Sequence, residues 1–181
     1  MKDFIYPEMM VHVPLCTHKE PKNILILSDN ATPLELEIAR HNDIKATSMP
    51  AQLDALRSAG DNAFDVVLSE VPCDAAVIAH LGRVIAEDGL LMSVHPSLLD
   101  ITENKIIMEI MAKYFKIIMP CRLEDGTTLL LASKSYHPTA DLILQRADML
   151  DGLSYYNCDI HPASFAMGNY IRKEYLGVIK N

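Results

Sequence analysis

The chain has 181 residues, of which 50% are hydrophobic and 22% are charged, so it can bury the core of one domain spanning residues 1–181. Its formal net charge of −8 argues against binding to nucleic acid, which requires clustered lysine and arginine. Its four cysteines form no C-x-x-C pair and no apolar run is long enough for a membrane span, so we expect reduced thiols and a cytoplasmic protein.

The first predicted element is a helix over residues 4–15, whose apolar side chains include Met9 and Met10. We expect this helix to end at Pro14, because proline interrupts helical hydrogen bonding. Residues 23–27 form a short, continuous apolar run. Such a run is typical of a strand that is buried on both faces of a parallel sheet.

A second helix is predicted over residues 33–41, directly after that strand. Thr32 is suited to cap the helix, Pro33 fits its first position, and Glu35 completes a capping box. A weaker strand is predicted over residues 44–47. One strand that is usual after this point in related sheets is expected to be missing, because the chain before the next clear strand is too short for it.

The middle of the chain continues to alternate between helices and strands. The pattern predicts helices over residues 51–59, 75–86 and 102–115, and strands over residues 64–69 and 89–94. Asp74 and Thr102 stand where they would cap the second and third of these helices.

The last third of the chain begins with two predicted strands, over residues 116–121 and 127–133, joined by Glu-Asp-Gly. Two final helices are predicted over residues 139–150 and 159–175. This alternation, closed by one hairpin, indicates an α/β fold with an open, mostly parallel Rossmann-like sheet, the type also found in class I methyltransferases, and an antiparallel strand from the C-terminal hairpin.

Ligands bind to such sheets at the carboxyl ends of the strands. The loop after the first strand, residues 28–32, has no glycine, although nucleotide-binding loops usually do. Asp29 in this loop is either a ligand-facing carboxylate or an ordinary turn residue. The loop after the second strand offers Ser48 and no acid for ribose hydroxyls.

Two carboxylates, Glu70 and Asp74, follow the strand at residues 64–69, and together they could bind an amine and accept its proton. A helix cap explains Asp74 on its own, whereas Glu70 has no equally good structural explanation. His95 stands at the end of the next strand and could lie near the same site. The histidines show no H-x-H or H-E-x-x-H spacing, so we expect no metal site.

Motifs at both ends of the chain carry a family resemblance. Residues 4–10 read Phe-Ile-Tyr-Pro-Glu-Met-Met and are followed by Pro-Leu and His-Lys-Glu-Pro, while residues 155–166 read Tyr-Tyr-Asn-Cys-Asp-Ile-His-Pro-Ala-Ser-Phe-Ala. Phe-Asp-Val at residues 64–66, Glu-Asp-Gly at 87–89 and Ala-Ser-Lys at 132–134 lie between them. In this order, these stretches resemble the spermidine synthase family of polyamine aminopropyltransferases.

The resemblance implies transfer of an aminopropyl group from decarboxylated S-adenosylmethionine to putrescine or a related diamine, in spermidine biosynthesis. It implies no cofactor beyond that co-substrate, a polyamine and a nucleoside as binding partners, no membrane partner, and a homo-oligomer. It places catalysis on Glu70 and Asp74. It also implies polyamine contacts from Tyr6, Asp29, Tyr155 and Tyr156, and nucleoside contacts from Ser28, Asn30 and Ser48.

The chain also departs from the family pattern. The acid of the family's glycine-rich loop falls on Ala31, the ribose-binding acid falls on Ser48, and the small N-terminal β-domain of the family is expected to be absent. Two interpretations therefore stay open: a divergent aminopropyltransferase, or a non-catalytic relative that lost the nucleoside site. A methyltransferase on the same fold is a third, which the closing Tyr-Tyr-Asn motif disfavours.

Several motif residues also have a structural alternative. Tyr155, Tyr156 and Phe165 could be core aromatics, and Glu8 and His161 could be hydrogen-bonding groups that hold the fold together.

Overall fold

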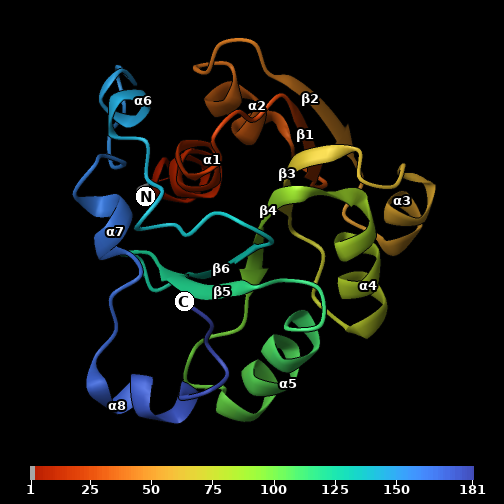
Figure 1. Cartoon of the computed structure of the whole chain (residues 1–181). Helices are drawn as coiled ribbons and strands as arrows, with labels where there is room; N and C mark the ends of the chain where they lie inside the picture. The colour runs from red at the N-terminus through yellow and green to blue at the C-terminus, as the bar shows by residue number, and fades with distance from the viewer. Residues whose placement is uncertain (1–2) are drawn as a thin grey trace.

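The computed structural model describes residues 3–181, and a six-stranded sheet runs through its centre in the order β2-β1-β3-β4-β6-β5 (Figure 1). The strands are β1 (Asn23–Leu27), β2 (Lys45–Met49), β3 (Phe64–Ser69), β4 (Ile85–His95), β5 (Ile117–Arg122) and β6 (Thr128–Ser133). Strands β1 to β4 pair in parallel, and β6 pairs antiparallel with both β4 and β5. The predicted α/β class, with its antiparallel hairpin strand, is confirmed.

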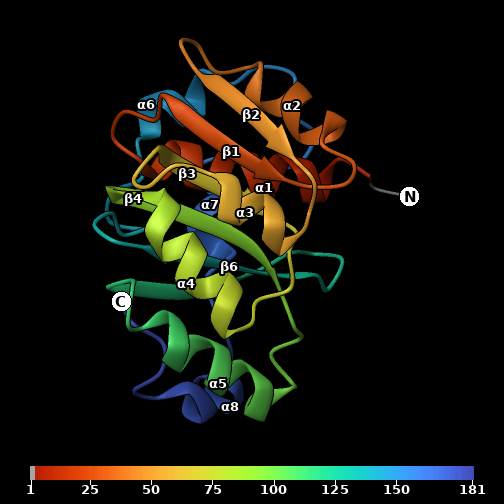
Figure 2. The same cartoon turned by 90° about the vertical axis from the view of Figure 1, so that its right-hand side faces the viewer.

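Helices cover both faces of this sheet (Figures 1 and 2). They are α1 (Ile5–Thr17), α2 (Thr32–Ile38), α3 (Leu53–Ser58), α4 (Ala75–Val84), α5 (Ile101–Met111), α6 (Leu144–Asp148), α7 (Ile160–Ala163) and α8 (Asn169–Arg172), followed by a 3-10 turn η1 (Lys173–Tyr175). Helices α1, α2 and α6 contribute to the hydrophobic core on one face, and α3, α4, α5 and α8 contribute to the core on the other.

Successive side chains along a strand point to opposite faces of the sheet and so pack into the two cores in turn. In β1, Ile24 and Ile26 belong to the core beneath α1, whereas Leu25 and Leu27 belong to the core beneath α3 and α4. All four side chains are fully buried, as expected for a central parallel strand. The strands predicted at residues 23–27 and 64–69 therefore have the observed bounds of β1 and β3.

Helix α1 is buried on nearly every side, so that Met9, Met10 and Cys16 have no exposed surface. The prediction that it ends at Pro14 is wrong, because the helix continues to Thr17. Pro14 lies in the last turn, where burial of the following residues holds the backbone in place. The Pro14 carbonyl still accepts a hydrogen bond from the His18 N–H at 3.0 Å.

Of the three predicted helix caps, only that of Asp74 is confirmed. Its Oδ1 accepts a hydrogen bond from the Val77 N–H at 2.8 Å at the start of α4. Thr32 and Thr102 are not caps, because each is already helical and the residues at the cap positions, Ala31 and Asp100, make no side-chain cap bond. Helix α4 ends at Val84, earlier than predicted, because the next residue joins β4.

The two long helices predicted after the hairpin are wrong. Helix α6 begins only at Leu144, because the Ile143 N–H bonds to the Cys16 carbonyl at 2.8 Å instead of continuing a helix. The second predicted helix is interrupted, because α7 ends at Ala163 and α8 begins only after Gly168, whose backbone is extended. Tertiary contacts thus replace local helical bonding in this part of the chain.

Two further observations concern residues 3–181. No helix in this range has both the length and the apolar character needed to cross a bilayer. All four cysteines, of which Cys16 and Cys121 are buried, are free thiols, as predicted.

Candidate active site

Three polar side chains converge where β1 and β3 end. Glu70 directly follows β3, Ser28 directly follows β1, and Tyr6 lies in the first turn of α1. The Tyr6 hydroxyl donates to Glu70 Oε1 at 2.8 Å, and the Ser28 hydroxyl donates to Glu70 Oε2 at 2.5 Å. Both oxygens of the carboxylate are thereby held in place.

The backbone fixes the position of this cluster. Strands β1 and β3 are neighbours, with Leu27 opposite Ser69, and the Glu70 N–H donates to the Leu27 carbonyl at 2.9 Å. Ser28 is oriented as well, because its Oγ accepts the Asn30 N–H at 3.0 Å. The cluster therefore lies at the edge of the sheet where open α/β folds bind their ligands.

The protonation of Tyr6 follows from its surroundings. Burial, and then its hydrogen bond to Glu70, raise the pKa of the Tyr6 phenol far above its usual value of 10.0. Tyr6 therefore remains a neutral hydrogen-bond donor. A carboxylate held by two neutral donors can bind an ammonium group or accept a proton from one.

A second carboxylate lies at the end of the neighbouring strand β2. The Ser48 hydroxyl donates to Glu35 Oε1, so a side chain from the first turn of α2 reaches the carboxyl end of β2. The sequence pattern assigned Glu35 to a capping box and missed this position. The only signal was its place, one helical turn after the loop at residues 28–32.

Asp29 and Asp74 are engaged elsewhere in the fold. Asp29 Oδ1 accepts the Ala51 N–H at 3.0 Å and so anchors the loop after β2. Asp74 caps α4 through its bond to the Val77 N–H. Five residues besides Glu70 were predicted to act on the amine, namely Tyr6, Asp29, Asp74, Tyr155 and Tyr156. Within residues 3–181, only Tyr6 among them has a hydrogen bond to Glu70.

The two tyrosines near the C-terminus belong to a different region. Tyr156 is buried, and its hydroxyl lies 2.7 Å from His161 Nδ1. Its ring contacts that of His12, with the ring centroids 5.2 Å apart. Tyr155 is half-buried and makes no hydrogen bond to Glu70. These positions fit the core-aromatic alternative for Tyr156.

Glu8 connects the motif near the start of the chain to the motif near its end. Its buried carboxylate accepts the backbone N–H groups of Ser154, Tyr155 and Tyr156, each at 2.8 Å. The Tyr-x-Glu motif of α1 thus holds the Tyr-Tyr-Asn segment directly. This is a structural role, as the hydrogen-bonding alternative predicted.

His95, which the sequence placed near the site, is buried at the end of β4. Its ring nitrogens make no hydrogen bond of normal geometry within residues 3–181. Burial lowers its pKa to about 4, although the neighbouring Asn104 acts in the opposite direction. Within the same range, no group of three or more histidine, cysteine, aspartate or glutamate side chains is arranged to hold a metal ion.

Two cavities, of about 350 and 690 Å³, lie away from the Glu70 cluster. The larger one is lined by residues at the amino ends of β1 and β2, including Lys22 and Ile44, and so lies at the opposite edge of the sheet. The case for Glu70 therefore rests on its polar geometry and on its place in the sheet.

Comparison with known proteins identifies the relatives of this chain. A family model described as the Spermine/spermidine synthase domain matches residues 3–56. The polyamine aminopropyltransferase of Helicobacter acinonychis is 26% identical, and the match covers 92% of this chain and 75% of that protein. The enzyme from Helicobacter pylori strain G27 is 24% identical over 99% of this chain and 80% of its own length.

The solved structures show the same fold. Spermidine synthase from Thermotoga maritima superposes with a TM-score of 0.84 at 23% identity, covering 98% of this chain and 75% of that protein. A spermidine synthase bound to the transition-state analogue AdoDATO gives a TM-score of 0.83 at 22% identity, covering 95% of this chain and 75% of that protein. The predicted resemblance to the spermidine synthase family is therefore confirmed.

The alignment also bears on the missing strand. It runs over 198 positions with the Helicobacter acinonychis protein, whereas this chain has 181 residues, so that relative has segments without a counterpart here. Between β2 and β3 the chain forms one short helix, α3, and no strand.

Proposed function

Because this chain resembles the polyamine aminopropyltransferases along nearly its whole length, we propose that it transfers an aminopropyl group from decarboxylated S-adenosylmethionine to putrescine or a related diamine. The observation that carries the proposal is the Glu70 carboxylate, held through both oxygens by Tyr6 and Ser28 where β1 and β3 end. This is the ligand-binding edge of an open α/β sheet.

In the proposed reaction, Glu70 first binds the substrate ammonium group and takes one of its protons. The neutral amine then attacks the carbon next to the sulfonium. The new C–N bond forms as the C–S bond breaks, and methylthioadenosine leaves with the bonding electron pair. Tyr6 is a positioning residue, since its raised pKa keeps it a donor to Glu70 and prevents it from acting as the base.

The nucleoside is proposed to lie beside Ser28 and Asn30, with its ribose near the end of β2. Glu35 supports this placement, because its carboxylate is bonded to the Ser48 hydroxyl at that strand end. A carboxylate in this position can accept hydrogen bonds from ribose hydroxyls. Glu35 would thus supply from α2 the acid that the loop after β2 lacks.

A second candidate function is a non-catalytic binding or interaction protein of the same fold that has lost the nucleoside site. It is favoured by the loop at residues 28–32, which has no glycine, and by Asp29, whose carboxylate already accepts the Ala51 N–H. In this reading the fold and the terminal motifs persist while the reaction is lost.

The deciding experiment measures methylthioadenosine release from decarboxylated S-adenosylmethionine and putrescine. We expect turnover by the wild-type protein and a loss of about 100-fold or more in kcat for Glu70→Gln, which removes the proton acceptor. Glu109→Gln is the matched control, because Glu109 is an exposed carboxylate on α5.

Calorimetry with methylthioadenosine separates the two functions. Micromolar binding of methylthioadenosine would argue against the non-catalytic protein, whereas no binding and no turnover of any diamine would favour it. Turnover that survives Glu70→Gln unchanged would overturn the role of Glu70 while leaving the transferase function intact.

A further inference from the structure

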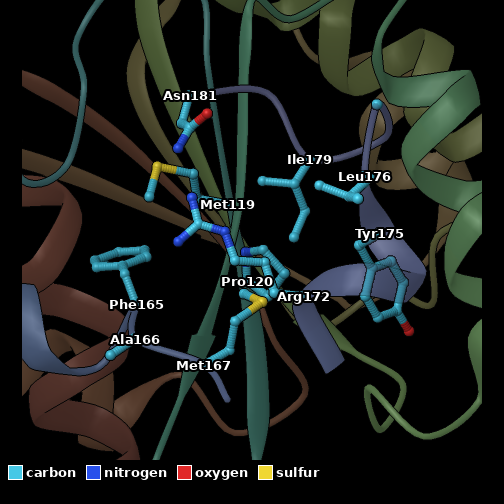
Figure 3. A pocket seen from close by; sticks show the side chains of 11 residues that line it. Met119, Pro120, Phe165, Ala166, Met167, Arg172, Tyr175, Leu176, Ile179 and Asn181 are labelled. Atoms are coloured by element: carbon cyan, nitrogen blue, oxygen red, sulfur yellow. The ribbon is translucent and has the colours of Figure 1, made fainter. Parts of the chain in front are cut away.

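The smaller cavity, of about 350 Å³, lies at the outer edge of the sheet, between β5 and the C-terminal segment of residues 165–181 (Figure 3). In the strand order, β4 and β6 separate β5 from β3, so this cavity is remote from the Glu70 cluster. Its size lies at the lower end of the range of pockets that bind small molecules.

The outer edge of β5, which borders the cavity, already has backbone hydrogen bonds at two residues. The N–H and carbonyl of Ile118 bond to Lys180 at 2.8 and 3.1 Å, and the Arg122 N–H donates to the Ser164 carbonyl at 2.8 Å. Between these two points lies Pro120, which has no N–H to offer. An added strand cannot pair here, so the cavity is suited to a ligand that contacts side chains.

The lining combines an apolar wall with one cationic side chain, Arg172, and two uncharged polar side chains, Tyr175 and Asn181. Met119 and Phe165 are almost completely buried, and Met167 and Ile179 complete the apolar wall. Arg172 on α8 lines the same space, and Figure 3 shows its guanidinium extending among these side chains toward Met119. Within residues 3–181 this guanidinium has no carboxylate partner and no hydrogen bond.

A guanidinium beside apolar side chains is suited to a ligand that carries both a carboxylate and an apolar group. The planar fork of arginine binds a carboxylate through two parallel hydrogen bonds, and the apolar wall buries a hydrocarbon or aromatic group attached to it. We propose that this cavity binds a small amphipathic carboxylate, with its charged group on Arg172 and its apolar group against Met119 and Phe165.

Such a ligand would add a contact between β5 and the C-terminal segment, which already packs into the core through Ile171 and Tyr175. The C-terminal segment pairs with β5 only through the bridge between Ile118 and Lys180. A molecule held by Arg172 on one side and Met119 on the other would fasten this segment to the sheet. Binding should therefore protect the amide groups of residues 165–181 from hydrogen exchange.

The test is a titration of the full chain, labelled with ¹³C-methyl methionine, with hexanoate and with its uncharged analogue hexanamide. The Met119 and Met167 signals are assigned with Met119→Leu and Met167→Leu. We expect hexanoate to shift both signals with a Kd on the order of 1 mM, and about tenfold more tightly than hexanamide.

The preference for the charged probe should disappear in Arg172→Gln and survive in Arg172→Lys. Lys173→Gln is the matched control, since it removes an exposed positive charge from the neighbouring position. Hexanoate shifting the methionine signals generally, rather than Met119 and Met167, would overturn the proposal. Equal affinity for both probes, or an unchanged preference in Arg172→Gln, would overturn it as well.

Discussion

Glu8 is a buried carboxylate whose role can be separated from catalysis. It accepts three backbone N–H groups from the segment at residues 154–156, and hydrogen bonds to a charged acceptor contribute more than neutral ones. Glu8→Gln replaces one acceptor oxygen by an NH2 group that faces a donor. We expect the free energy of unfolding to fall by about 2 kcal/mol.

Urea denaturation at pH 7 measures this change, and the exposed Glu109→Gln again serves as control. A loss as small as that of a surface substitution, about 0.5 kcal/mol or less, would contradict the structural role.

The role of Asp74 can be tested by substitution, because its carboxylate is either a helix cap or a catalytic acid. Asp74→Ser keeps a cap-forming oxygen and removes the acid, whereas Asp74→Ala removes both. If capping is its role, Asp74→Ala should lower the free energy of unfolding by about 1 kcal/mol, while Asp74→Ser should retain both stability and methylthioadenosine release. A large loss of kcat in Asp74→Ser would instead assign the residue to catalysis.

At the scale of the elements, the contact between α1 and α2 depends on neutral histidines. His12 Nδ1 lies 2.9 Å from Nε2 of His41, and His12 Nε2 lies 3.0 Å from Glu37 Oε2 on α2. Burial is the main cause that lowers the pKa of His12 to about 4 and that of His41 to about 3. Both rings are therefore neutral in the native state at pH 6, where the unfolded chain is already protonated.

The sign of the pH dependence follows from this difference. Above the unfolded histidine pKa of about 6.5 neither state binds these protons, and stability is highest. As the pH falls from 6.5 toward 4, only the unfolded chain binds them, so stability declines by up to about 1.4 kcal/mol per pH unit for each such histidine. His41→Asn removes one of these sites and should make the slope between pH 6.5 and 4.5 less steep.

Urea denaturation across this range measures the slope, and His80→Gln on α4 controls for loss of a histidine outside the cluster. A slope that is the same in His41→Asn and the wild type would contradict the contribution of His41.

The elements also show where sequence alone was sufficient. Strands β1 and β3 were predicted with their observed bounds, because a buried parallel strand is a continuous apolar run and needs no partner to be recognised. The end of α1 and the start of α6 were not predictable. Both depend on distant contacts, namely the burial that holds the last turn around Pro14 and the bond from Ile143 to the Cys16 carbonyl.

The same distinction applies to the candidate site. Glu70 was predicted because a carboxylate directly after a buried strand has few structural explanations. Its partners Tyr6 and Ser28 were expected at the site from the family resemblance, and the structure joins both to Glu70. Glu35 was missed, because its side chain crosses from α2 to β2 and its sequence neighbours favour a local capping bond.

For the whole molecule, a nucleoside that binds only the folded chain must raise its stability. The proposed nucleoside site draws on the ends of β1 and β2 and on the first turn of α2, so occupancy links several elements at once. At a methylthioadenosine concentration 100 times its Kd, we expect the free energy of unfolding to rise by about 2.7 kcal/mol.

Glu35→Gln should weaken this stabilisation, because a carboxamide is a poorer acceptor for ribose hydroxyls than a carboxylate. A tenfold loss of affinity would reduce the gain at the same nucleoside concentration to about 1.4 kcal/mol. Thermal unfolding with and without methylthioadenosine measures both values, with Glu109→Gln as the control. Equal stabilisation of Glu35→Gln and the wild type would remove Glu35 from the site, and no stabilisation of the wild type would argue that the nucleoside site is lost.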